Sequence, residues 1–302
     1  MMKQSQKRNN KILNFYKQTS TYTDLGYYKD FARKLPDDIN ELCLLQRRQI
    51  IHPFVIKENE GEINEYYGDL SKIPAHLRIF EDDLYPTAIS VLAELLRRDN
   101  NYGYNRKVED KIHVTCRGEA ILLASILKAK GIAARVRSGF GFYVSSFEGG
   151  AGDHWITEYY NKKEKRWILV DPDFHDFDSD TEVDSNDIKE HEFLTAARAY
   201  LGIRNKIIPE KEIYYASTPY EYGLKAAVRA LYYDFNSLMN NEIFFLHLPE
   251  YAIKNDLKLN KKELKELDFI ANLMLKPNEN FDELKKIWTK NNKFKVTSGG
   301  FN

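Results

Sequence analysis

The stretch "VTCRGEAILL" (residues 114–123) places one of the chain's two cysteines at the start of an apolar run. The run continues to Leu127, which is the length of a buried helix, and Gly131 stands where a left-handed residue commonly ends one. We therefore expect a buried helix that begins at Thr115 or Cys116. A helix N-terminus supplies partial positive charge and N–H groups, and both favour a thiolate at Cys116.

The helix dipole alone does not make this cysteine a strong nucleophile. It contributes about 0.3–1 kcal/mol, whereas one pKa unit corresponds to about 1.36 kcal/mol. A reactive thiolate therefore also needs a nearby histidine and a third group that orients that histidine.

Two β-prone segments further along the chain supply both groups. "HWITEYY" (154–160) and "RWILVD" (166–171) flank a short polar turn, which predicts an antiparallel hairpin. A four-residue loop at 161–164 would set His154 opposite Asp171. Directly opposed side chains share a face, with Cβ atoms about 4.5–5.5 Å apart. If this register holds, Asp171 orients His154 and stabilises its protonated form.

The other cysteine has a different setting. Cys43 lies in "INELCLLQRRQI" (39–50), on the apolar face of a predicted helix that Asp37 or Asp38 caps. A cysteine on such a face packs as a small buried hydrophobe. We expect Cys43 to be structural.

The order of the elements predicts an α+β fold with helices first, a central antiparallel sheet and a helical C-terminal part. Residues 1–35 form a polar lead-in, residues 36–205 a core, and residues 206–302 a helical C-terminal extension packed on that core. Residues 188–201, "IKEHEFLTAARAYL", predict a further helix.

The composition limits the classes of partner. Lys+Arg 45 and Asp+Glu 45 give a formal net charge of +0, which argues against nucleic acid and anionic membranes as partners. No long apolar run predicts a membrane-spanning helix or a signal peptide. Two distant cysteines do not make a disulfide framework, so a reducing, cytoplasmic setting is expected. The sequence does not indicate the oligomeric state.

An acidic run follows the second hairpin strand. Asp176, Asp178 and Asp180 alternate as in a calcium-binding EF-hand loop, but Thr181 stands where glycine is needed and Asp187 where glutamate is expected. A solvated acidic loop is the favoured reading, and no cysteine pair supports structural zinc. We expect no metal ion and no cofactor.

Three blocks together resemble the transglutaminase-like superfamily. They are "CRGEAILLASILKAKGIAARVRSGF" (116–140), "DHWITEYY" (153–160) and "RWILVDPD" (166–173), and the resemblance covers roughly residues 112–174. They look like that family's cysteine-bearing helix and strand, its histidine strand and its Trp-x-x-x-Asp-Pro segment, in the same order.

The resemblance implies a papain-like fold and a Cys-His-Asp triad. In that reading Cys116 is the nucleophile, His154 the general base and acid, and Asp171 the orienting group. The expected reaction is hydrolysis or acyl transfer at an amide bond, peptide or isopeptide-like, through a thioester. A peptide or protein is the expected substrate.

Further residues are candidates for the oxyanion site and the cleft. The backbone N–H of Cys116 is one oxyanion donor, and Tyr104, Asn105 and Trp155 are the other candidates. The glycine-containing loop 145–153 is expected to act as a flap beside the cleft.

Two departures from the family pattern bear on the reaction. Animal transglutaminases carry a tryptophan upstream of the cysteine, whereas Trp155, Trp167 and Trp288 all lie downstream of Cys116. The paired CxxC zinc ligands of the peptide N-glycanase branch are missing. A protein-cross-linking transglutaminase therefore remains an alternative, as does a catalytically silent peptide- or protein-binding module on the same fold.

Overall fold

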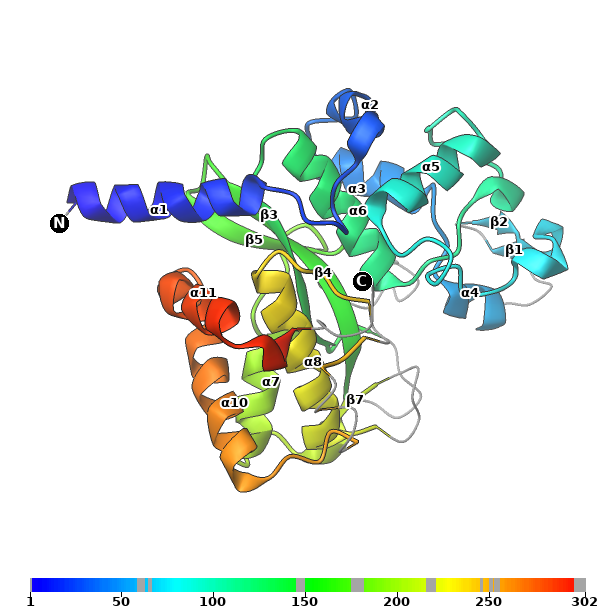
Figure 1. The fold of residues 1–302 in the computed structure, drawn as a ribbon. Helices are drawn as coiled ribbons and strands as arrows, with labels where there is room; N and C mark the ends of the chain where they lie inside the picture. Colours follow the sequence, from blue (N-terminus) through cyan, green and yellow to red (C-terminus); the bar gives the residue numbers. More distant parts are fainter. Residues whose placement is uncertain are drawn as a thin grey trace. The chain divides into compact units, whose positions relative to one another are not determined.

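The chain divides into two compact units that are interleaved in the sequence. The computed structural model describes residues 2–58, 63–64, 67–144, 150–174, 182–215, 221–244, 247–249, 252 and 256–295. Unit 1 comprises Met1–Tyr16, Arg135–Trp155 and Ile188–Asn302, and unit 2 comprises Lys17–Ala134 and Ile156–Asp187. Strand β4 (Ala151–Asn161), which is labelled in Figure 1, has residues that belong to both units.

Helix α6 (Cys116–Ala129) lies in unit 2 and confirms the predicted buried helix. Its residues from Cys116 to Lys128 are all buried, because helices α2, α3 and α5 pack against it. The Thr157 hydroxyl donates a hydrogen bond to the Ala120 carbonyl and so ties α6 to β4. Gly131 follows the helix with φ +76°, a left-handed conformation that glycine adopts without strain.

Apart from the strands of the predicted hairpin, the remaining described elements of unit 2 are short. They are α2 (Lys29–Arg33), α3 (Ile39–Arg47), α4 (Pro53–Glu58), α5 (Ala88–Arg98), η1 (Gly26–Tyr28), η2 (Leu70–Lys72), η3 (Ala75–Leu77), η4 (Val108–Asp110) and the paired strands β1 (Ile63–Asn64) and β2 (Gly68–Asp69). The predicted structural role of Cys43 is confirmed: it lies in the middle of α3 and is 1% exposed. Asp38 caps this helix by accepting a hydrogen bond from the backbone N–H of Glu41.

The predicted hairpin is confirmed, but its register is not. Strand β5 (Arg166–Val170) pairs antiparallel with β4, from Thr157 opposite Val170 to Asn161 opposite Arg166. The turn therefore occupies residues 162–165 instead of 161–164, because the Asn161 carboxamide oxygen accepts hydrogen bonds from the backbone N–H groups of Lys163 and Glu164. The expected opposition of His154 and Asp171 on this ladder is wrong.

Unit 1 is mainly helical. Its described elements are α1 (Met2–Lys17, whose last residue belongs to unit 2), β3 (Ala134–Gly141, whose first residue belongs to unit 2), β6 (Phe193–Thr195), α7 (Ala196–Arg204), η5 (Glu210–Glu212), β7 (Ile213–Tyr214), α8 (Gly223–Leu238), α10 (Lys261–Met274), α11 (Phe281–Lys290) and η6 (Asn292–Phe294). Helix α7 packs against α8 and α10. Arg137 of β3 forms a buried two-point ion pair with Asp234 of α8, which joins the strand to the helices.

The sheet has the strand order β5-β4-β3-β6, and β7 pairs with β4. The β4–β5 and β3–β6 pairs are antiparallel as expected, whereas β7 lies parallel to β4. The prediction of one helix over residues 188–201 is wrong in its first half, where β6 pairs with β3 before α7 begins. The mixed α+β class is confirmed, and the predicted boundaries at residues 36 and 206 stay predictions.

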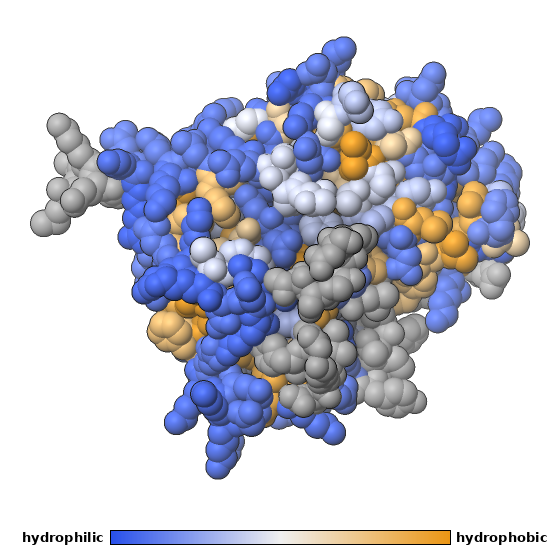
Figure 2. Space-filling model, in the orientation of Figure 1, coloured by the Kyte–Doolittle hydropathy of each residue, from blue (hydrophilic) through white to orange (hydrophobic). Residues whose placement is uncertain are grey.

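The face of the molecule in Figure 2 is mainly hydrophilic, with separate hydrophobic areas. Among the residues that the structure describes, no helix is both long and apolar enough to cross a membrane.

Candidate active site

Cys116 is the first residue of α6, as predicted, and it is 8% exposed. Thr115 precedes the helix, and its backbone N–H and its hydroxyl both donate hydrogen bonds to the carboxylate of Asp82. Burial raises the pKa of the Asp82 carboxyl to about 6. A titrating acid therefore lies at the N-terminus of the helix that presents the thiol.

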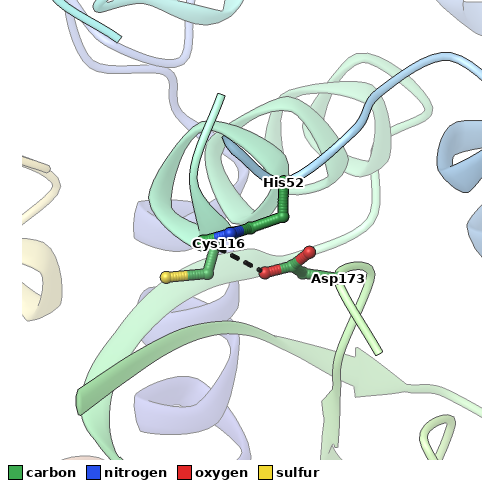
Figure 3. A group of neighbouring side chains, drawn as sticks. All are labelled: His52, Cys116 and Asp173. Atoms are coloured by element: carbon green, nitrogen blue, oxygen red, sulfur yellow. Dashed lines mark ion pairs between the residues drawn. The ribbon is translucent and has the colours of Figure 1, made fainter. Parts of the chain in front are cut away.

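His52 and Asp173 lie beside Cys116 in the same unit. One ring nitrogen of His52, the Cys116 Sγ and one Asp173 carboxylate oxygen all lie within 4.8 Å of one another (Figure 3). His52 directly precedes α4, and Asp173 lies in the turn after β5. His52 Nε2 is 3.9 Å from Asp173 Oδ2, and in Figure 3 the sulfur points away from this carboxylate.

Asp171 is fully buried and helps to shape the turn that carries Asp173. Its Oδ1 accepts a hydrogen bond of 2.9 Å from the Asp173 backbone N–H. The buried guanidinium of Arg47 donates to the carbonyls of Asp171 and Pro172 and to the hydroxyl of Ser185. These contacts fix the position of Asp171 and Asp173 relative to α3.

A second acid lies behind Asp173. Glu119 is fully buried in the first turn of α6, and burial together with the neighbouring Asp173 raises the pKa of Glu119 well above its ordinary value. Burial and the nearby Asp173 carboxylate both disfavour the charged form of Glu119.

Cysteine, histidine and aspartate are ligand types that zinc accepts. The hydrogen bonding of His52 disfavours this use. The backbone N–H of Phe54 donates to His52 Nδ1 at 3.3 Å, so the hydrogen of the neutral ring is on Nε2. A nitrogen that carries hydrogen has no lone pair for a metal ion, and Nε2 is the atom that faces Asp173.

Two of the predicted site residues lie in unit 1. His154 in β4 is 6% exposed, and its ring meets the Tyr143 ring edge-on with centroids 5.9 Å apart. Trp155 is 2% exposed and packs on Tyr233 of α8, with centroids 5.3 Å apart. This packing buries Trp155 in the helical unit.

The other two oxyanion candidates lie in a surface turn before η4. Tyr104 is 48% exposed, and its hydroxyl donates a long hydrogen bond of 3.5 Å to the Glu41 carbonyl. Asn105 is also exposed. Both stay predictions as oxyanion donors.

Some predicted features lie outside the described residues. They are the acidic residues Asp176, Asp178 and Asp180, Thr181, and most of the predicted flap, residues 145–149.

Comparison with known families places the site residues in context. The transglutaminase-like superfamily matches residues 97–172, a segment that contains Cys116, His154 and Asp171. This segment is similar to the core of the transglutaminase-like superfamily. The match supports cysteine-type catalysis in general. Asp173 directly follows the last matched residue, whereas His52 lies 45 residues before the first one (97 − 52).

Other comparisons add little to this assignment. The crystal structure of a "putative cysteine protease" from Cytophaga hutchinsonii is similar with a TM-score of 0.30 and 14% identity, over 60% of this chain and 44% of that one. The chain thus spans less than half the length of that protein. No curated protein matched the sequence.

The sequence reasoning missed His52, Asp82 and Asp173. The segment "DPD" (171–173) after the second hairpin strand contained the signal for Asp173, because a turn that positions Asp171 also positions the aspartate two residues later. His52 and Asp82 carry no comparable local signal, since only the tertiary fold brings them to the start of α6.

Proposed function

We propose that the protein is an enzyme that hydrolyses or transfers an acyl group at an amide bond, with Cys116 as the nucleophile. The observation that carries the proposal is the position of Cys116 as the first residue of a buried helix within a transglutaminase-like core. Burial of α6 holds the thiol in a fixed place, and the helix N-terminus favours its ionised form.

The proposed general base and acid is His154, and the proposed orienting group is Asp171, as the resemblance of the sequence blocks implies. The Cys116 thiolate attacks the carbonyl carbon, and a tetrahedral intermediate forms. His154 then gives a proton to the departing amine as the C–N bond breaks, and a thioester remains on Cys116. Water or a second amine then attacks the thioester while His154 accepts its proton, the C–S bond breaks, and the acid or the new amide leaves the regenerated Cys116 thiolate. A peptide or protein is the proposed substrate.

A peptide library with and without added methylamine tests this proposal. Mass spectrometry is expected to find cleaved or deamidated peptides with the native protein, methylamine adducts if an amine acceptor wins, and neither with Cys116→Ser. Cys43→Ser serves as the matched control and is expected to keep the products. If no product depends on Cys116, the enzyme proposal fails and the alternative of a binding module is favoured.

A further inference from the structure

His52 is held in one orientation next to the proposed nucleophile. Its ring packs against Phe54, with centroids 5.2 Å apart, and Phe54 packs edge-on against Phe80. The His52 side chain is 14% exposed, and Asp173 flanks its Nε2. Packing and local hydrogen bonding therefore fix the direction in which this imidazole presents its polar atoms.

The hydrogen bond from the Phe54 backbone determines what the ring can do. Because His52 Nδ1 accepts this N–H, Nδ1 uses its lone pair there, and the hydrogen of the neutral ring is on Nε2. The distance of 3.9 Å from Nε2 to Asp173 Oδ2 is longer than a hydrogen bond. The neutral ring thus presents an N–H donor on its Nε2 edge and has no lone pair there to accept a proton.

A donor is what the reaction needs beside the sulfur. When a thiolate attacks a carbonyl, negative charge develops on an oxygen that is two bonds from the sulfur, and a stabilising donor lies about 2.7–3.1 Å from that oxygen. A ring nitrogen within 4.8 Å of Cys116 Sγ is close enough to make that contact.

We infer that His52 is a further catalytic residue whose Nε2–H donates a hydrogen bond to the oxyanion that forms when Cys116 attacks a carbonyl. This inference rests on the proposed function. It gives His52 a role different from that of the base His154: it stabilises charge on the substrate oxygen and transfers no proton.

Asp173 is compatible with this role. Its backbone N–H donates a hydrogen bond to the buried Asp171 carboxylate, which holds Asp173 in place beside His52. A carboxylate near Nε2 also favours the ring orientation in which the Nε2–H faces Asp173 and Cys116.

Two reactions of the same thiol separate an oxyanion donor from a base. Acylation of Cys116 by p-nitrophenyl acetate passes through an oxyanion, and the burst of nitrophenolate reports its rate. Alkylation by iodoacetamide is a displacement at saturated carbon and forms no oxyanion. A residue that only stabilises the oxyanion affects the first reaction, whereas a residue that ionises the thiol affects both.

His52→Ala is expected to slow acylation about 100-fold and to leave the alkylation rate within about twofold of the native value. His52→Gln places an amide N–H near the former Nε2 and is expected to recover most of the acylation rate. His76→Ala removes an exposed histidine in η3 and serves as the control without effect. Circular dichroism of each variant verifies that it is folded.

Equal losses in acylation and alkylation, or no loss in either, would overturn the role of His52. So would a Gln variant as slow as the Ala variant. If native protein and Cys116→Ser show the same background with the ester, the proposed function fails, and the inference about His52 fails with it. Acylation that depends on Cys116 but not on His52 overturns only the inference.

Discussion

Cys43 and Cys116 belong to the same unit and are both buried, yet their surroundings differ in chemistry. Cys43 lies in the middle of α3, where burial raises the pKa of its thiol to about 12. Cys116 begins α6 and has a histidine and a carboxylate within 4.8 Å. The position of a cysteine along its helix, more than its exposed area, thus separates a packing residue from a candidate nucleophile.

The largest expected effect is a difference in alkylation between the two thiols. At pH 8 a thiol with a pKa of about 12 is about 10⁻⁴ ionised, so folded Cys43 should react about 10³-fold more slowly than an ordinary thiol. Peptide mapping after a short iodoacetamide pulse is expected to find the label on Cys116 alone. In denaturant both cysteines should react. Comparable labelling of Cys43 in the folded protein would remove the distinction.

The next effect concerns what activates Cys116. If His154 pairs with the thiolate, the alkylation rate of the native protein stays high below pH 8, and His154→Ala is expected to lower the rate at pH 6 by about 10–100-fold. The measurement is the alkylation rate of Cys116 across pH, with His76→Ala as the control. An unchanged profile that follows an ordinary thiol pKa of about 8.5 would show that Cys116 is no more activated than a free cysteine.

The sequence predicted the setting of both cysteines because each depends on local pattern. An apolar run with Gly131 behind it defines α6, and an acidic cap with apolar spacing defines α3. The hairpin was predictable as an element for the same reason. Its register was not, because the hydrogen bonds that the Asn161 side-chain oxygen accepts from the Lys163 and Glu164 backbone N–H groups move the turn by one residue.

The surroundings of Cys116 could be predicted only in part. His52 precedes Cys116 by 64 residues (116 − 52) and Asp173 follows it by 57 (173 − 116). No periodicity links positions so far apart, and long-range packing alone brings them together. The tautomer of His52 depends on one backbone N–H two residues away, which no pattern of residue types encodes.

A third effect tests Asp82, the carboxyl group that accepts hydrogen bonds from Thr115 at the start of α6. Burial raises the pKa of Asp82 from 3.8 to about 6, so the folded state favours the protonated form. The contribution of Asp82 protonation to the free energy of unfolding is fully present below pH 3.8 and is lost as the pH rises through about 6. The loss is about 3 kcal/mol, from (6 − 3.8) pKa units at about 1.36 kcal/mol each.

Asp82→Asn should remove this dependence, because the amide stays neutral and its oxygen still accepts the Thr115 hydrogen bonds. Urea unfolding at pH 4 and pH 8 measures this pH dependence. When the pH rises from 4 to 8, the free energy of unfolding of the variant is expected to increase by up to about 3 kcal/mol relative to that of the native protein. The exposed neighbour offers the control, Asp83→Asn. Parallel pH dependence in the native protein and Asp82→Asn would contradict the assignment.

The smallest expected effect lies at the far end of α6. A Cβ at Gly131 would meet nothing within 4 Å, so the cost of Gly131→Ala is the left-handed backbone alone, about 1–2 kcal/mol of stability. A Cβ at Gly118, two residues after Cys116, would lie 2.8 Å from the Val114 side chain and force it to move.

Urea unfolding together with Cys116 alkylation compares Gly131→Ala with Gly118→Ala. Gly131→Ala should lower stability and leave the alkylation rate unchanged, whereas Gly118→Ala should alter both, because only that substitution disturbs the end of the helix that holds the thiol. A slower reaction of Cys116 in Gly131→Ala would mean that the whole helix, and not its first turn, sets the reactivity that distinguishes Cys116 from Cys43.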